Sequence, residues 1–466
     1  MIENSKTKYA EEITTKKIVF FSLNTVISGF LFAMWGQIQY YAAVVLLIPL
    51  TIIPLIYLFY SIVDGINDPV IGYLADRHKK LTSKLGKRFP WIMIGVIISP
   101  MLLLLCFIPI SNNVIILAIW LGLMMVLYET FLTLYEVNHS ALFPDLFREL
   151  SERRKVSVIA GIIGGVIGIF TAIMIPLLIS NLGGLTNSAY ISTVSIVLVL
   201  VYILVIPYSR GVYEPQEMKK FRAELDITER ASSSIKEILT RIFNDKNWMA
   251  IILVNFCWAI AGACFIYGLN FFVTHYLGLN IGYTAFPLLF LGIVSFACSP
   301  IWIWITKKIG VKKTYITAIF FNIIGYFLLF FVNDITSLIL VFAFAGIGFS
   351  ATFGVVFNLL WAEGIDNAAI NSGKREEGSY NGVLRVFSAF SYFLQTLIFT
   401  IVASITGYNP ALGTKNSEFA KFGLKLQMSL IPMVILLVGA ICFVFLYNIS
   451  KEEAILNKEK LIKMGL

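Results

Sequence analysis

Long apolar segments alternate with short polar segments along the chain. A helix needs roughly 20 apolar residues to cross the hydrocarbon core of a bilayer, and twelve segments are long enough to do so. We therefore predict an all-α integral membrane protein with twelve transmembrane helices. The predicted helices cover residues 17–44, 47–75, 90–110, 113–143, 155–181, 188–208, 247–276, 284–306, 314–332, 336–362, 377–406 and 424–448.

The longest polar segment, residues 209–246, is rich in Lys, Arg, Glu and Asp and separates the sixth predicted span from the seventh. It divides the chain into three predicted parts. These are an N-terminal six-helix bundle over residues 1–208, a central cytoplasmic loop over 209–246, and a second six-helix bundle with a cytoplasmic tail over 247–466.

Basic residues gather on one side of the predicted spans. If successive spans alternate in direction, 32 of the 36 Lys and Arg residues lie on the side of the two termini. Loops rich in Lys and Arg stay in the cytoplasm, so we predict a multi-pass protein of the plasma membrane with cytoplasmic termini. The net charge of +9 follows from this distribution and gives no sign of nucleic-acid binding. Polar residues 1–15 lack the cleavage site of a removed signal peptide.

The composition excludes several other classes of protein. The chain is 58% hydrophobic and 14% charged, whereas soluble domains are about 45–50% apolar and about 25% charged. A disordered or fibrous chain is excluded, and a soluble enzyme is disfavoured. Five cysteines without a CxxC pair give neither a disulfide framework nor a zinc pattern.

A short internal repeat links the two predicted bundles. Residues 61–77 (SIVDGINDPVIGYLADR) and 292–308 (GIVSFACSPIWIWITKK) align at an offset of 231 and share Ile, Val and Pro at matching positions. Two parallel six-helix repeats are the plan of the major facilitator fold, in which the substrate binds between the halves near the membrane midplane. We predict this fold. The aspartates of the first copy are serines in the second, so the two halves differ in their polar groups.

Two carboxylates lie inside the second predicted span. Asp64 and Asp68 are four residues apart and therefore share one face of a helix. Counted from Asp76 at the end of the span, Asp64 lies about 18 Å deep at a rise of 1.5 Å per residue. Carboxylates this close repel each other unless a cation or a proton lies between them, and Asn67 adds a neutral oxygen. We predict a site for a hard cation such as Na⁺; the alternative is a structural pair bonded to a neighbouring helix.

The fourth and eleventh spans carry further ionisable residues. Glu136 lies about 18 Å from the end of its span, at the depth of Asp64, and carboxylates at such a depth usually have a function. We predict that Glu136 contacts the substrate and that His139, one turn away, is either a partner or a packing residue. Arg385 lies about 15 Å inside the eleventh span. It can face Glu136 or Asp64, and pairing between helices is the alternative.

Several short motifs resemble those of one transporter family. They are Asp-x-x-Asn-Asp-Pro at 64–69, Gly-x-x-x-Asp-Arg at 72–77, Gly-Lys-Arg-x-Pro-Trp at 86–91 and REEGSYNG at 375–382, with Pro144 closing the fourth span. In these motifs the chain resembles the glycoside–pentoside–hexuronide:cation symporters, the group of melibiose permease, within the major facilitator superfamily. The resemblance implies cation-coupled symport of a sugar or sugar-like solute by alternating access.

The resemblance also implies which residues bind the coupling cation. The family uses two aspartates and an asparagine of the second span with a threonine of the fourth. All four are present at the matching positions, which are Asp64, Asn67, Asp68 and Thr133. The coupling ion would be Na⁺, H⁺ or Li⁺, and no other cofactor is expected.

The implied sugar site is less complete. The acid of the fourth span is present as Glu136, but the acid of the first span is replaced by Ser28 and a sugar-stacking aromatic residue by Ser140. The predicted substrate-binding residues are therefore Glu136, Arg385, Ser28, Ser140 and His139. The arginine of the fifth span is missing, and the lysine of the eleventh falls on Ser388, three residues after Arg385. Other sugars, sugar acids or non-sugar solutes therefore remain open as substrates.

We predict a secondary transporter and not an enzyme. Its expected partners are a small-molecule solute, a carbohydrate by the resemblance, and membrane lipid, and we expect a monomer. The main alternative is an uncoupled or proton-coupled facilitator of a non-sugar solute. A sensor without transport is another. A remote one is an intramembrane enzyme like the prenyl transferases, because Asp64 and Asp68 faintly resemble their Mg²⁺–diphosphate motif, although the second acidic cluster of those enzymes is missing.

Overall fold

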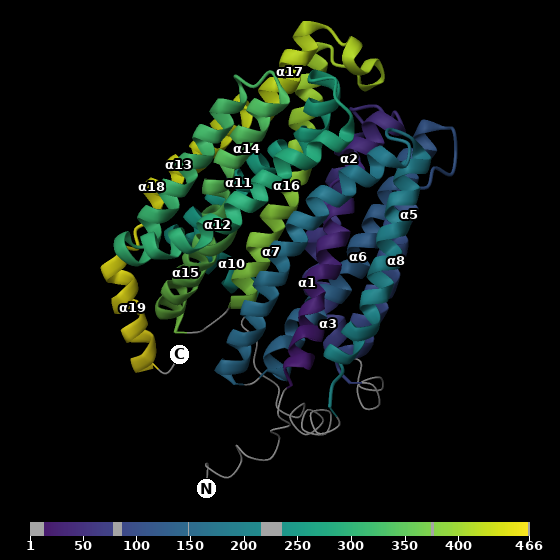
Figure 1. Cartoon of the computed structure of the whole chain (residues 1–466). Helices are drawn as coiled ribbons and strands as arrows, with labels where there is room; N and C mark the ends of the chain where they lie inside the picture. The colour runs from purple at the N-terminus through teal and green to yellow at the C-terminus, as the bar shows by residue number, and fades with distance from the viewer. Residues whose placement is uncertain (1–13, 78–85, 148, 216–234, 374–376, 465–466) are drawn as a thin grey trace. The chain divides into compact units, whose positions relative to one another are not determined.

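The structure, a computed structural model, describes residues 14–77, 86–147, 149–215, 235–373 and 377–464, and every regular element among them is helical (Figure 1). The α-helices are α1 (Thr15–Trp35), α2 (Ile38–Tyr40), α3 (Ile53–Arg77), α5 (Phe89–Cys106), α6 (Val114–Leu146), α7 (Leu150–Asn181), α8 (Asn187–Gly211), α10 (Ile235–Asn244), α11 (Lys246–Phe271), α12 (Ala285–Ile309), α13 (Val311–Leu329), α14 (Ile335–Phe349), α15 (Val356–Ser372), α16 (Glu377–Thr406), α17 (Glu418–Met428), α18 (Leu430–Leu446) and α19 (Lys451–Met464). The π-helical turns are η2 (Tyr41–Val45), η3 (Phe272–Tyr276) and η5 (Ser350–Val355). The 3₁₀-helical turns are η4 (Ile281–Thr284) and η6 (Pro410–Lys415).

The all-α prediction is confirmed, and every predicted span falls on one helix or on consecutive helical elements: the first covers α1, α2 and η2, the tenth α14, η5 and part of α15, and the twelfth parts of α17 and α18. Ten helical stretches in the described part of the chain are long and apolar enough to cross a membrane. The second predicted span contributes a shorter apolar stretch, Ile53–Asn67, and the ninth corresponds to α13. The predicted start of the second span at residue 47 is wrong, because Leu47 has a positive φ of 53° and Pro49 follows, so the helix begins only at Ile53.

Residues outside the described part include several that the topology prediction uses. The basic residues of 1–13, of 78–85 and of 216–234 lie there. Within the described end of the predicted central loop, residues 235–244 form the helix α10. The polar tail contributes a further helix, α19.

Side-chain caps fix where the long helices begin. Asn113, Asp245 and Asp334 stand directly before α6, α11 and α14, and each side chain accepts two backbone N–H groups of the following turn. Such a cap satisfies donors that the first turn of a helix leaves without partners. The predicted spans begin within about two residues of these caps, because an Asn or Asp before an apolar run is a typical helix start.

Contacts divide the chain into two compact units. The first comprises Met1–Ile38, Ile66–Thr171 and Asn187–Ser232, and the second comprises Gln39–Gly65, Ala172–Thr186 and Ser233–Leu466. In the first unit α5 packs along α6 and α8, and α1 packs along α8. Gly95 allows the contact of α5 with α6, since a Cβ there would lie 2.6 Å from the carbonyl oxygen of Phe131.

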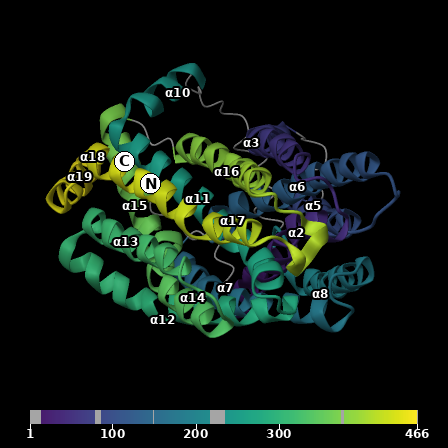
Figure 2. The ribbon, with the colours of Figure 1, turned by 90° about the horizontal axis from the view of Figure 1, so that it is seen from above.

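In the second unit α12, α13 and α14 lie side by side, as the view from above shows (Figure 2). The helix α11 packs against α16 and α18. The core of this unit is aromatic: the rings of Phe265 and Phe342 stack with centroids 4.2 Å apart, and Trp248 is fully buried. Large apolar side chains also lie on the surface, among them Phe445 and Ile405, which are 77% and 69% exposed. Helices that are apolar all round are typical of a membrane protein.

The internal repeat is confirmed in the backbone. The π-helical turns η2 and η3 begin at Tyr41 and Phe272, which are separated by the same 231 residues as the repeated sequence. Each turn is followed by a residue with positive φ, Leu47 at 53° and Gly278 at 68°, again at that offset. Leu47 is the one described residue other than glycine with a positive φ. The repeat therefore extends well beyond the short stretch that the sequence reveals.

Candidate functional site

A stripe of polar side chains runs along α6 in the first unit. Glu129, Thr133 and Glu136 are spaced by four and three residues and so share one face of this uninterrupted helix. The Thr133 hydroxyl lies 3.4 Å from Oε1 of Glu129. Ser28 of α1 donates a hydrogen bond of 2.9 Å to Oε1 of Glu136. The structure thus brings together two of the predicted substrate residues, Ser28 and Glu136.

The helix α3 meets this stripe through an amide. Asn67 donates from Nδ2 to the hydroxyl of Thr130 over 3.2 Å, and Thr130 in turn donates to the carbonyl oxygen of Val126. The predicted cation ligand Asn67 therefore lies next to the helix that carries Thr133. Sequence reasoning missed Thr130, although its place three residues before Thr133 in an apolar span was a signal.

Asp64 and Asp68 are one turn apart on α3, as predicted. Asp64 is half-buried, and the side chain of Asp68 lies outside the described residues. Among the side chains that are described, no three His, Cys, Asp or Glu residues gather as a group that can hold a metal ion. The cation site of Asp64, Asn67, Asp68 and Thr133 stays a prediction.

His139 and Ser140 differ in their surroundings. His139 is buried, its Nδ1 lies 2.9 Å from the hydroxyl of Tyr208 on α8, and its ring stacks on Phe21 with centroids 4.2 Å apart. These contacts are typical of a packing residue with a satisfied ring nitrogen. Ser140, one residue further along α6, is exposed.

Arg385 is exposed on α16 in the second unit. Within that unit α16 meets the first half of α3: Ser61 donates to the carbonyl oxygen of Ala389 over 2.8 Å, and a Cβ on Gly65 would lie 3.5 Å from Val386. This helix contact adjoins both Arg385 and Asp64 in sequence. The pairing of Arg385 with Asp64 or Glu136 stays a prediction.

The Gly-Lys-Arg-x-Pro-Trp motif has a structural role that the sequence did not reveal. The buried carboxylate of Glu214, just after α8, accepts the backbone N–H groups of Lys87, Arg88 and Phe89 at 3.2, 2.6 and 3.0 Å. It therefore caps the start of α5, where a negative charge is favoured. Gly86 makes this approach possible, since a Cβ there would lie 2.8 Å from the carboxylate.

We expect Gly86→Ala to lower the melting temperature of the purified protein. Gly86 has φ of 104°, a conformation that side chains rarely adopt, and such strain costs about 1–3 kcal/mol before the clash with Glu214 is counted. Gly161→Ala on α7 is the control, because a Cβ at Gly161 meets nothing within 4 Å. Equal melting temperatures for both variants would contradict this role of the motif.

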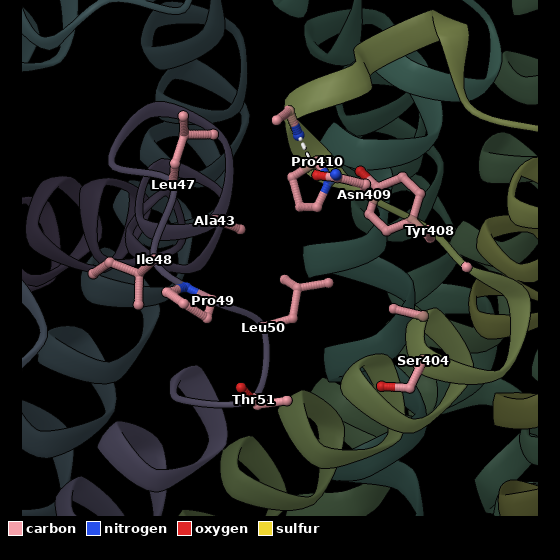
Figure 3. Close-up of a pocket in the computed structure, with 13 residues that line it drawn as sticks. Ala43, Leu47, Ile48, Pro49, Leu50, Thr51, Ser404, Tyr408, Asn409 and Pro410 are labelled. Atoms are coloured by element: carbon pink, nitrogen blue, oxygen red, sulfur yellow. Dashed lines mark hydrogen bonds between the residues drawn. The ribbon is translucent and has the colours of Figure 1, made fainter. Parts of the chain in front are cut away.

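A cavity of about 450 Å³ lies in the second unit. Figure 3 shows the segment around Leu47 and Pro49 on one side and the segment around Tyr408 and Pro410 on the other. Thr400 bridges the two segments nearby by donating to the carbonyl oxygen of Leu50 over 2.6 Å. None of the residues predicted to bind cation or substrate lines this cavity.

Comparisons with known proteins agree with the fold. Among solved structures, the D-xylose–proton symporter superposes with a TM-score of 0.64 at 12% identity, over 94% of this chain and 98% of that one. The nucleoside transporter NupG gives 0.63 at 13% identity, over 94% and 100%. These likenesses confirm the major facilitator fold.

Relatives in sequence include two kinds of transporter. A stretch of 111 residues is 32% identical to lactose permease of Lactobacillus helveticus, but it covers only 23% of this chain and 17% of that protein. Sodium-dependent lysophosphatidylcholine symporter 1 of Xenopus tropicalis is 21% identical over 440 residues, which cover 85% of this chain and 80% of that protein. The family model described as MFS/sugar transport protein matches residues 12–451. The chain therefore belongs to this family of major facilitator superfamily transporters.

Proposed function

We propose that the chain is a secondary active transporter that couples symport of a cation and a sugar or sugar-like solute. The observation that carries the proposal is the carboxylate pair Asp64 and Asp68 inside an apolar helix, with Asn67 between them bonded to the polar stripe of α6. The family membership supports solute transport. The motifs support the glycoside–pentoside–hexuronide:cation branch of the superfamily. The distribution of Lys and Arg supports a protein of the plasma membrane with cytoplasmic termini.

In the proposed mechanism the cation binds first among the oxygens of Asp64, Asp68, Asn67 and Thr133. It neutralises two carboxylates that otherwise repel each other. Glu136 lies three residues from Thr133 on the same face of α6, so the solute would bind beside the cation. Cation and solute then favour the same conformation of the transporter, and each raises the affinity of the other.

Glu136 suits a solute that is rich in hydroxyl groups. A carboxylate accepts hydrogen bonds from two hydroxyls, and charge-assisted bonds are the stronger kind. In the structure one oxygen of Glu136 accepts the hydroxyl of Ser28, a bond of the kind that a sugar hydroxyl would make. Arg385 would add donors or pair with the carboxylate of a sugar acid.

A second candidate is a facilitator of a non-sugar solute, proton-coupled or uncoupled. It is favoured by the replacements in the implied sugar site, Ser28 and Ser140. Relatives that align over 85% of the chain are sodium-dependent symporters of lysophosphatidylcholine. They support an amphipathic lipid-like solute among the candidates, but their sodium dependence supports coupling to Na⁺ and not this second mode of transport.

A thermal-shift screen of the purified protein tests these functions. Ligands that bind only the folded state stabilise it, by about 2.7 kcal/mol at a hundred times the dissociation constant. We expect a rise in melting temperature with a sugar or sugar acid that is larger in Na⁺ than in choline. Stabilisation by lysophosphatidylcholine alone would favour the second candidate, and a cation-independent response to every solute would contradict coupling.

A further inference from the structure

Two equivalent residues of the internal repeat are in contact with each other. Tyr40 and Phe271 directly precede η2 and η3, and they are separated by the repeat offset of 231 residues. Their rings pack edge to face with centroids 4.8 Å apart. Parallel repeats are related by a two-fold axis along the membrane normal, and equivalent residues touch only beside that axis. The contact of Tyr40 with Phe271 therefore marks the axis at this end of the helices.

This contact lies at the end of the first span opposite to the N-terminus, and it is sealed. Tyr40 and Phe271 are each only 1% exposed. Phe399 of α16 closes one side, with its ring centroid 4.6 Å from that of Phe271. His275 and Tyr408 close another through a hydrogen bond between Nδ1 and the hydroxyl. A solute that moves along the axis between the repeats has to pass these side chains.

One hydrogen bond breaks the symmetry of the seal. The hydroxyl of Tyr40 lies 2.6 Å from that of Thr274. Thr274 already donates its single proton to the carbonyl oxygen of Asn270 over 2.7 Å, so Tyr40 is the donor. The symmetric counterpart does not exist, because Phe271 and Ala43 occupy the equivalent positions and carry no hydroxyl. The first and seventh spans are thus joined here by one polar bond within an apolar contact.

The backbone on both sides of the seal is irregular. η2 and η3 are π-helical turns that leave their helices through residues with positive φ, Leu47 and Gly278. π-helical turns are rare and frequently lie at functional sites. Glycine adopts this conformation at Gly278 without strain, but a leucine in it is strained. The backbone at Leu47 nevertheless has a positive φ, as it does at the equivalent Gly278. Such segments offer places where the ends of the two spans can rearrange.

We propose that Tyr40 and Phe271 form the gate that closes the transport path at this end, and that the hydrogen bond from Tyr40 to Thr274 is its latch. The inference rests on the proposed transport function, since a gate requires a path. Opening separates the two rings and breaks the latch. Closing restores both and blocks the path at this end.

Accessibility of a cysteine below the gate tests the proposal. Ala389→Cys in a background without the native cysteines is a suitable reporter: Ala389 is 3% exposed and lies about 15 Å below Phe399 along α16. Its carbonyl oxygen, which accepts the bond from Ser61, is unchanged by the substitution. The readout is the rate of labelling by an impermeant maleimide added outside intact cells.

We expect Tyr40→Phe and Thr274→Val each to raise this rate about 2- to 12-fold, because a net hydrogen bond shifts an equilibrium by that factor. The double variant should label no faster than the faster single variant, since both changes remove the same bond. Thr274→Ser keeps the hydroxyl and should label as slowly as the parent. Tyr315→Phe is the matched control, because the buried hydroxyl of Tyr315 has no hydrogen-bond partner among the described residues.

Labelling of Tyr40→Phe and Thr274→Val at the rate of Tyr315→Phe would overturn the latch. Additive increases in the double variant would do so as well, because they would mean that the two hydroxyls act separately. The readout needs neither a known solute nor a coupling ion. A negative result for cation coupling therefore does not change the interpretation of the labelling rates. The gate and the cation coupling can each be contradicted without the other.

Discussion

Asp64→Asn and Asp68→Asn are each expected to abolish cation-stimulated uptake while the protein still assembles in the membrane. Asparagine keeps the shape and an oxygen of the side chain but removes the charge that makes the site attractive to a cation. Loss of one charge also removes the repulsion that the cation relieves. Uptake measured against external Na⁺ and against pH should become flat in both variants.

The second repeat supplies matched controls for this experiment. Ser295 and Ser299 are the equivalents of Asp64 and Asp68 on α12, where they bond to the carbonyl oxygen of Gly346 and to the hydroxyl of Ser350. We expect Ser295→Ala and Ser299→Ala to retain the cation dependence of the parent. If both aspartate variants kept it too, α3 would not carry the coupling site.

Glu136→Gln is expected to weaken solute binding about 10- to 150-fold, the range for loss of hydrogen bonds to a charged group. Cation binding to Asp64 and Asp68 should survive, because Glu136 is outside that site. Affinities for solute and cation, measured separately on the purified variant, check this directly. Ile119→Val is a control on the same helix, since Ile119 is exposed and has no predicted role in binding.

A structural role for Glu136 makes a different prediction. If Glu136 and Arg385 formed a salt bridge that only holds the protein together, the double variant Glu136→Gln/Arg385→Gln would recover transport that each single variant loses. With Glu136 as a solute contact we expect the other outcome, in which the double variant is at least as impaired as Glu136→Gln. Recovery would remove Glu136 from the binding site.

The fold was largely predictable because a membrane imposes a simple requirement. Each span must be apolar for roughly 20 residues and must satisfy its own backbone hydrogen bonds, so hydropathy alone finds the helices. It does not find where a helix changes to a π-helical turn or starts late. Those features depend on local backbone geometry, as at Leu47, where no glycine or other sequence signal announces a positive φ.

The candidate site was predictable in its residues more than in its contacts. Ionisable groups in apolar spans stand out, and this singled out Asp64, Asp68 and Glu136. Their partners are common polar residues whose role depends on the packing of helices distant in sequence. The bond from Ser28 to Glu136 joins residues 108 positions apart, and the cap by Glu214 joins residues more than 120 apart; the sequence shows no periodicity from which either follows.

If one transporter binds cation and solute together, each must change the affinity of the protein for the other. With the solute from the thermal-shift screen, its affinity is measured by titration with and without saturating cation, and the affinity of the cation is measured with and without saturating solute. Linkage requires the two factors to be equal. We expect equal factors of about 5- to 150-fold, the usual range of coupling between sites, and their loss in Asp64→Asn. A solute affinity that does not change with the cation would contradict this coupling.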